Sequence, residues 1–217
     1  MKKNGFTLTE LLVSLVIFSF MAVTLSTVYA TANRFFFQQY REDMWKNRLT
    51  LSMKFIKNKL SAATEIERPA LGTETNDLAF YTNFIKSPPG DTTYPGNGCA
   101  PTRTVSSQWH YFCVNSNVLY YYTGTLAGVT QCPNEVGVAN WIGTISCGVT
   151  GGGVVLSQNI TIPANRTTYF GRVNTPSNTV RISLRMLWQA TGGFSTIARN
   201  IDTSDETYVT INRPAAW

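Results

Sequence analysis

The sequence predicts an α+β fold, in which one long N-terminal helix packs on a C-terminal antiparallel β domain that contains disulfides. Two observations predict the helix: residues 6–68 contain neither Gly nor Pro, and their apolar positions follow helical spacing. A third observation predicts the β domain. From residue 77 onward, short runs of β-branched and aromatic residues alternate with turn residues. The 217 residues are 43% hydrophobic, so a substantial core can form.

The N-terminal residues combine a short basic leader with a long apolar run. Lys2 and Lys3 lie in the leader, residues 1–5, and the run over residues 6–30 carries a single charge, Glu10. A helix over this run is about 37 Å long, enough to cross a bilayer with tilt. Because positive residues flank the cytoplasmic side of such spans, we expect a transmembrane helix over 6–30 with its N-terminus in the cytoplasm.

Residues 31–63 continue the helix with an amphipathic pattern. Its apolar residues recur every three or four positions and therefore share one helix face: Trp45, Leu49, Met53, Ile56 and Leu60. Charged residues fill much of the remaining surface. The pattern predicts that this half of the helix packs on the β domain, residues 64–217. Pro69 and Gly72 mark the end of the helix.

The β domain contains strand patterns separated by turns. We expect strands over 77–82, 109–114, 118–123, 154–162, 168–173, 180–189, 194–200 and 207–212. The second and third form a hairpin around 115–117, whereas 85–103 and 124–153 are rich in turn residues. The acidic stretch 202–206 is predicted to be a solvated turn, with calcium binding as the less favoured alternative.

Four cysteines lie in the middle of the chain, at Cys99, Cys113, Cys132 and Cys147. They form no Cys-x-x-Cys pair, and the sequence has one histidine, so disulfides are favoured over zinc. Disulfides indicate an oxidising compartment outside the cytoplasm, and buried free thiols are the alternative. Of the three pairings, we favour Cys99–Cys113 and Cys132–Cys147, because each joins neighbours in sequence.

The composition offers little for catalysis. His110 lies between Trp109 and Tyr111 in an expected strand, which favours a structural or exposed histidine. No phosphate-binding glycine motif is present in the sequence. We therefore expect neither an enzyme nor a cofactor or metal site.

One charge pattern suggests nucleic acid. Between Glu135 and Asp202 the chain has no acid but five arginines: Arg166, Arg172, Arg181, Arg185 and Arg199. Interleaved aromatics could stack on bases while the arginines contact phosphates. The alternative is that the arginines are solvated charges on strand edges, where they discourage edge pairing.

The segment Lys3-Asn4-Gly5-Phe6-Thr7-Leu8-Thr9-Glu10-Leu11-Leu12 resembles the class III signal of type IV pilins and type II secretion pseudopilins. The resemblance implies a pilin-like fold. It also implies cleavage between Gly5 and Phe6 by a prepilin peptidase, which methylates the new N-terminus at Phe6. The apolar helix is retained. In this family the acid corresponding to Glu10 is thought to neutralise the N-terminal amine of the adjacent subunit in the filament.

Beyond the signal, residues 48–63 and the stretch 180–184 are similar to PilW-like minor pilins and PulJ-type minor pseudopilins. The usual acid near the helix end is replaced by Asn58 and Lys59. Major pilins often bend the membrane half with Gly or Pro, which this chain lacks there, and commonly close their C-terminal region with one disulfide. The mid-domain cysteines therefore favour a minor component.

The resemblance implies a minor pilin in the tip or initiation complex of a type IV pilus. The alternatives are a minor pseudopilin of a type II secretion system and a pilus-tip receptor for DNA or a surface. Expected partners are other pilins or pseudopilins, prepilin peptidase, the inner-membrane assembly platform and the inner membrane itself. The β domain would lie in the periplasm and then in an extracellular pilus or a periplasmic pseudopilus.

Overall fold

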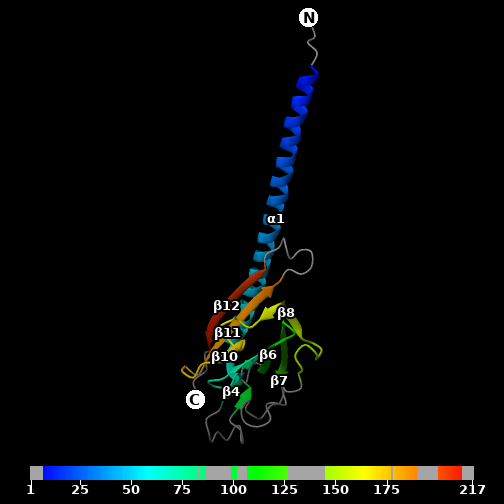
Figure 1. Cartoon of the computed structure of the whole chain (residues 1–217). Coiled ribbons are helices and arrows are strands. Elements are labelled where there is room, and N and C mark those ends of the chain that lie inside the picture. Colours follow the sequence, from blue (N-terminus) through cyan, green and yellow to red (C-terminus); the bar gives the residue numbers. More distant parts are fainter. Residues whose placement is uncertain are drawn as a thin grey trace. The chain divides into compact units, whose positions relative to one another are not determined.

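The computed structural model describes residues 7–82, 84–86, 99–101, 107–126, 145–176, 178–189 and 200–211. Within these residues the chain forms one helix, α1 (Leu8–Ser61), and antiparallel sheets, which confirms the predicted α+β class (Figure 1). The chain divides into two compact units, Met1–Met44 and Trp45–Trp217.

The first unit contains the N-terminal part of α1. Its apolar side chains are exposed from Leu8 to Tyr29, and the helix is long and apolar enough to cross a membrane. Four of the hydroxyl groups that interrupt the apolar run bond back to helix carbonyls, those of Ser14, Ser19, Thr24 and Thr27; Ser19 Oγ, for example, lies 2.8 Å from Leu15 O. These internal bonds allow the hydroxyl groups to enter an apolar environment at low cost.

The second unit is built mainly from two five-stranded sheets. The first has the order β1 (Ala63–Arg68), β3 (Asp77–Thr82), β6 (Ser107–Asn115), β7 (Val118–Leu126), β8 (Val154–Gln158). The second has the order β12 (Ile201–Thr210), β11 (Thr179–Trp188), β10 (Phe170–Arg172), β2 (Glu74–Thr75), with β9 (Ile160–Thr161) also on β11. A short ladder joins β4 (Phe84–Lys86) and β5 (Cys99–Pro101).

Local sequence signals predicted several strands. The strand expected over 77–82 is β3, and the expected hairpin is β6 and β7. Ser116 and Asn117 connect the hairpin with φ angles of 50° and 63°. Two central residues with positive φ are typical of the tight turn that matches the twist of hairpin strands.

Other predictions were wrong. The acidic stretch 202–206 is not a turn but the middle of β12, because its side chains pair with basic residues of neighbouring segments. The strand β1 was missed, and the expected loop 85–103 contributes β4 and β5. The strand expected over 194–200 lies outside the described residues, except for Asn200.

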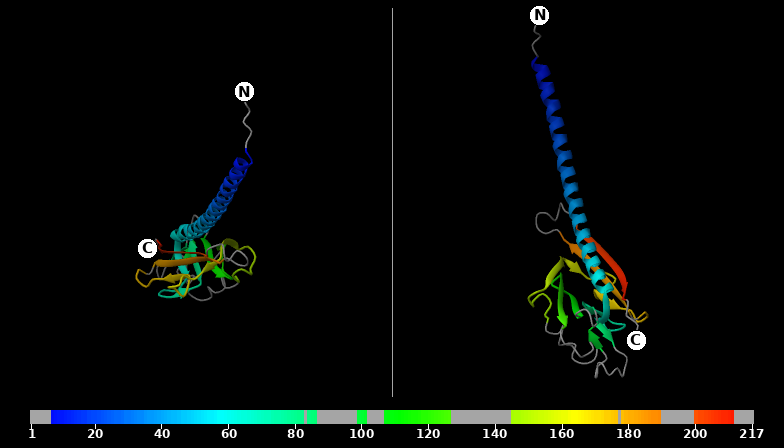
Figure 2. Two further views of the ribbon diagram at one scale, coloured as in Figure 1. Left: turned by 45° about the horizontal axis from the view of Figure 1, so that its top comes forward. Right: turned by 180° about the vertical axis from the view of Figure 1, so that it is seen from behind.

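The C-terminal part of α1 packs on the β domain, as its apolar stripe predicted. Ile56 and Leu60 are fully buried. The Phe55 ring meets the rings of Phe112 and Tyr121 on the first sheet, with centroids 6.1 Å and 5.1 Å away. The right-hand view of Figure 2, from behind, shows this end of α1 lying against the strands. The second sheet adds a fully buried row at Val180, Ile182, Leu184 and Met186.

Aromatic rings cover the opposite face of the first sheet, where Tyr81, Tyr111 and Tyr122 surround Cys113. Glycine makes room for these rings. A Cβ atom at Gly124 would lie 2.6 Å from the Trp109 ring on the paired strand. The backbone at Gly124 is therefore in direct contact with the indole.

We expect Gly124→Ala to destabilise the protein by about 1–3 kcal/mol, because the added methyl group forces the Trp109 ring or the strand to move. Thermal unfolding of the full chain in detergent measures the effect. Gly151→Ala is the matched control, since nothing lies within 4 Å of a Cβ atom at Gly151. Equal melting temperatures for the two variants would contradict the prediction.

Candidate functional site

The start of α1 is organised by two polar side chains. Thr7 Oγ1 accepts a hydrogen bond from the Glu10 N–H at 3.3 Å. In return, Glu10 Oε2 accepts bonds from the Thr7 N–H at 3.0 Å and from the Thr7 hydroxyl at 2.9 Å. This reciprocal pattern is a capping box, which satisfies backbone donors that a helix start otherwise leaves unpaired.

The capping box gives Thr7 a role that the sequence reasoning missed. The signal was present, because a Thr followed three residues later by Glu before an apolar run is typical of a helix start. The helix begins at Leu8, so the predicted cleavage site lies on the N-terminal side of the cap. Gly5 and Phe6 themselves lie outside the described residues. Glu10 is exposed in the single chain and remains accessible to a partner.

Comparison with known families supports the interpretation of this segment. Residues 1–26 match the family described as "Prokaryotic N-terminal methylation motif". The chain therefore begins with a prokaryotic N-terminal methylation motif. The exposed apolar helix and the methylation motif together fit a protein that is anchored in a membrane by its N-terminal helix.

The chain is similar to the structure of a type IV-like pilin from Thermus thermophilus, with a TM-score of 0.38 and 8% sequence identity. The similarity covers 76% of this chain and 96% of that one. No curated protein matches the chain.

The structure corrects the predicted disulfide pairing. Cys113 is bonded to Cys147, with Cα atoms 6.0 Å apart, so the pairs Cys99–Cys113 and Cys132–Cys147 are both wrong. Proximity in sequence failed because residues 145–150 lie over the tyrosine-covered face of the first sheet, which Cys113 shares. Cys99 and Cys132 remain, but the side chain of Cys99 and all of Cys132 lie outside the described residues.

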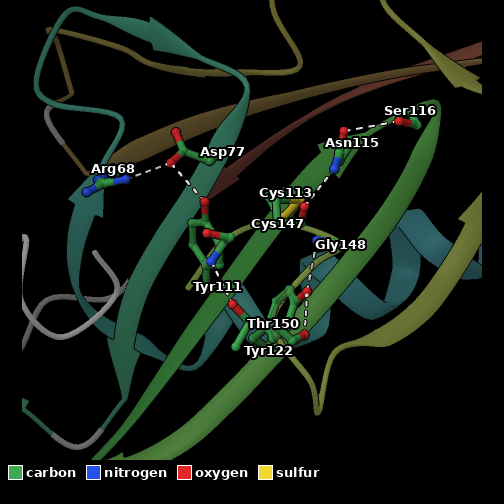
Figure 3. Close-up of a disulfide and its surroundings, with 11 residues drawn as sticks. Arg68, Asp77, Tyr111, Cys113, Asn115, Ser116, Tyr122, Cys147, Gly148 and Thr150 are labelled. Atoms are coloured by element: carbon green, nitrogen blue, oxygen red, sulfur yellow. Dashed lines mark hydrogen bonds and ion pairs between the residues drawn. A yellow bond between two sulfur atoms is a disulfide. The ribbon is translucent and has the colours of Figure 1, made fainter. Parts of the chain in front are cut away.

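Hydrogen bonds hold the segment around Cys147 against the sheet (Figure 3). Asn115 Nδ2 donates to the Cys147 carbonyl at 2.7 Å, and the Gly148 N–H donates to the Tyr122 hydroxyl at 2.9 Å. The Tyr122 hydroxyl donates in turn to the Thr150 carbonyl. The disulfide therefore fixes a segment that also has specific polar contacts with the sheet.

His110 is a core residue with only 2% of its surface exposed. Its Nδ1 lies 2.8 Å from the Tyr121 hydroxyl, and its Nε2 lies 3.3 Å from the Thr82 hydroxyl. Burial, and to a smaller extent the charge of Lys59, lowers the pKa of His110 to about 4. A neutral histidine with hydroxyl partners has the features of a structural residue.

Three of the arginines assigned to nucleic acid pair with acids. Arg166 donates two hydrogen bonds to Glu206, at 2.9 Å and 2.7 Å. Arg185 forms the same kind of bidentate pair with Asp202, through hydrogen bonds of 2.7 Å and 2.5 Å. Arg181 lies 3.0 Å from Glu74.

A fourth, Arg172, is buried and donates to the Ile66 carbonyl, while Arg199 lies outside the described residues. The acids that receive the paired arginines include two from the stretch predicted to be a turn. These four arginines therefore do not form a row of unpaired cations that could contact phosphates. Nucleic-acid binding stays a prediction that the described residues do not support.

A buried acid lies at the end of β1. The Glu67 side chain is 7% exposed and accepts a hydrogen bond from the Tyr81 hydroxyl. Arg68, which contacts Glu67 at 3.7 Å, makes a shorter ion pair with Asp77 at 2.8 Å. Burial raises the pKa of Glu67 to about 7, and the bond from Tyr81 offsets only part of this effect.

The Glu67 carboxyl should therefore make stability depend on pH. Because its pKa in the folded state lies above the ordinary 4.5, its contribution is present below pH 4.5 and is lost as pH rises through 7. We expect Glu67→Gln to be more stable than wild type at pH 8 by about 2–3 kcal/mol and equal to it near pH 4. Urea unfolding at both pH values measures this difference.

A suitable control for Glu67→Gln is Asp205→Asn. Asp205 is an exposed acid of β12, so its replacement should change the free energy of unfolding by less than about 0.5 kcal/mol, as is usual for surface substitutions. If Glu67→Gln shifted stability by the same amount at pH 4 and pH 8, the carboxyl would not be the titrating group.

Proposed function

We propose that the protein is a minor pilin, a structural and assembly component of a type IV pilus that acts in the tip or initiation complex. The observation that carries the proposal is the methylation motif over residues 1–26, which overlaps the start of a long helix, Leu8–Ser61, without Gly or Pro. In this proposal residues 1–5 are a leader, cleaved between Gly5 and Phe6 by prepilin peptidase. The same enzyme methylates Phe6.

After processing, residues 6–30 anchor the protein in the inner membrane. Residues 31–63 continue the helix as far as the β domain, residues 64–217, which lies in the periplasm. The assembly platform then moves the helix from lipid into a bundle of pilin helices. Such a transfer costs little hydrophobic free energy, because the apolar side chains leave one apolar environment for another.

Glu10 favours the filament over the membrane as the final location of the helix. A carboxylate inside a membrane is costly, by about 2.5–3.5 kcal/mol at the bilayer centre and less near the interface. The capping box satisfies part of the Glu10 carboxylate within its own chain. The N-terminal amine of a neighbouring Phe6 would supply the opposite charge, so the pair favours the filament and sets the register between helices.

The disulfide supports a minor rather than a major component. Cys113–Cys147 lies in the middle of the β domain, whereas major pilins commonly close their C-terminal region. Residues 48–63 resemble PulJ-type pseudopilins as well as PilW-like minor pilins. A minor pseudopilin of a type II secretion system is therefore the second candidate.

Deleting the gene separates the two candidates. For a minor pilin we expect few or no pili and unchanged export of type II secretion substrates, with both properties restored by the wild-type gene. Loss of secretion with normal piliation would overturn the minor pilin and favour the pseudopilin. Electron microscopy counts the pili, and assays of culture supernatants measure secretion.

A further inference from the structure

Four aromatic side chains lie close together on α1, a short distance beyond the apolar run. Phe35, Phe36, Phe37 and Tyr40, which we call the aromatic belt, are each 55–66% exposed. The rings of Phe36 and Phe37 contact each other edge to face, with centroids 6.5 Å apart. Exposing so much aromatic surface to water is unfavourable, and contiguous apolar surface of this kind typically marks an interaction site.

The aromatic belt surrounds most of the helix. Successive residues of an α-helix are rotated by about 100°, so Phe35, Phe36 and Phe37 point in three directions, and Tyr40 falls between the last two. A partner helix meets one stripe of side chains, about 100° wide. The aromatic belt covers about twice that angle, so a single partner helix would leave at least one ring bare. A lipid bilayer surrounds a helix and contacts all four rings at once.

The position of the belt along α1 matches the boundary of a bilayer. Residues 11–33, between Glu10 and Arg34, carry no charge and form about 35 Å of helix. The hydrocarbon core of a bilayer is about 30 Å thick, and the headgroups increase this to about 40–45 Å. Glu10 and Phe36 are about 39 Å apart along the helix, so each can lie in one headgroup layer. Residues 41–43, which follow the belt directly, are all charged and suit water.

Helix geometry also directs the rings toward the membrane. The Cα–Cβ bonds of an α-helix tilt toward its N-terminus, which is the membrane side of the belt. The Phe rings therefore lean toward the acyl chains, whereas the hydroxyl group of Tyr40 can stay among the headgroups. Arg34 is exposed and has no ion pair or hydrogen bond with another described residue, so its guanidinium can bind lipid phosphates.

We infer that the aromatic belt binds phospholipid at the boundary between acyl chains and headgroups in the periplasmic leaflet, and so fixes the depth of α1 in the membrane. Aromatic rings are enriched at this boundary, where they anchor membrane helices. The inference rests on the membrane anchor of the proposed function and extends that anchor from residue 30 to residue 40. It does not depend on whether the protein serves a pilus or a secretion system.

Quenching of tryptophan fluorescence by brominated phospholipids tests the inference. The full-length protein is placed in vesicles of phosphatidylethanolamine and phosphatidylglycerol, with bromine either near the headgroup end or near the methyl end of the acyl chains. Phe36→Trp reports on the belt, and Val23→Trp reports on the middle of the span. The five native tryptophans, of which Trp45 is the nearest, lie beyond the belt, and the unsubstituted protein supplies their background signal.

We expect Phe36→Trp to be quenched roughly twofold more by bromine near the headgroup end than by bromine near the methyl end, and Val23→Trp to show the opposite preference. Leu51→Trp is the matched control, because Leu51 is an equally exposed apolar residue of α1 beyond the charged residues, and it should not be quenched. If Val23→Trp were quenched and Phe36→Trp were not, the rings would lie in water or against protein, which would overturn the inference and leave the anchor intact.

Two other outcomes are equally decisive. Stronger quenching of Phe36→Trp by bromine near the methyl end would put the belt in the hydrocarbon core and would also overturn the inference. Absence of quenching in both reporters would overturn the membrane anchor of the proposed function as well.

The control of depth is tested in the Val23→Trp protein. Replacing Phe35, Phe36 and Phe37 with Gln removes the rings, so the preference of position 23 for bromine near the methyl end should be lost as the helix shifts. Replacing the same residues with Tyr keeps the rings and should leave the preference unchanged. An unchanged preference in the Gln variant would show that the belt does not fix the depth of α1.

Discussion

Glu10→Ala is expected to remain in the inner membrane and to be almost absent from filaments, with incorporation reduced at least tenfold. Removing the carboxylate makes the apolar helix a better membrane span, so insertion is preserved. It also removes the charge that would pair with the N-terminal amine of a neighbour, so a favourable contact made only in the filament is lost. Immunoblots of inner membranes and of sheared filaments measure the two populations.

Thr7→Ala is the matched control for Glu10→Ala. It removes the capping hydroxyl at a cost of about 1 kcal/mol to the helix start, but it keeps the carboxylate. We expect Thr7→Ala to enter filaments at near wild-type levels. Normal incorporation of Glu10→Ala would reject the proposed role of this acid, whereas equal losses in both variants would assign that role to the capping box.

Cys113→Ser is expected to lower the stability of the folded β domain by about 3–4 kcal/mol, because the Cys113–Cys147 bridge constrains a segment with a sequence separation of 34. The loss should also free the segment around Cys147 from the tyrosine-covered face of the first sheet. Urea unfolding of the full chain in detergent gives the free-energy difference.

The pairing itself is tested by combining substitutions. Cys147→Ser should cost as much as Cys113→Ser, and the double variant should cost no more than either, because all three break the same bridge. If the cysteines were paired with their neighbours in sequence, the two single substitutions would break different bridges and their costs would add.

Features that depend on residues close in sequence could be predicted without the structure. The helical stripe that includes Ile56 and Leu60 follows from positions three and four apart. The hairpin at Ser116 and Asn117 depends on a few adjacent residues. The capping box of Thr7 and Glu10 also depends on residues close in sequence, so the same kind of pattern could have predicted it.

The sequence by itself therefore determined the long helix, the methylation motif at its start and the β-rich character of the domain, because short-range patterns specify each of them. Only the tertiary structure decided which partners distant residues have. Arg166 meets Glu206 across a separation of 40 residues, and Cys113 meets Cys147 across 34. These contacts arise from strand order and register, which bring distant residues to one face and which no local pattern specifies.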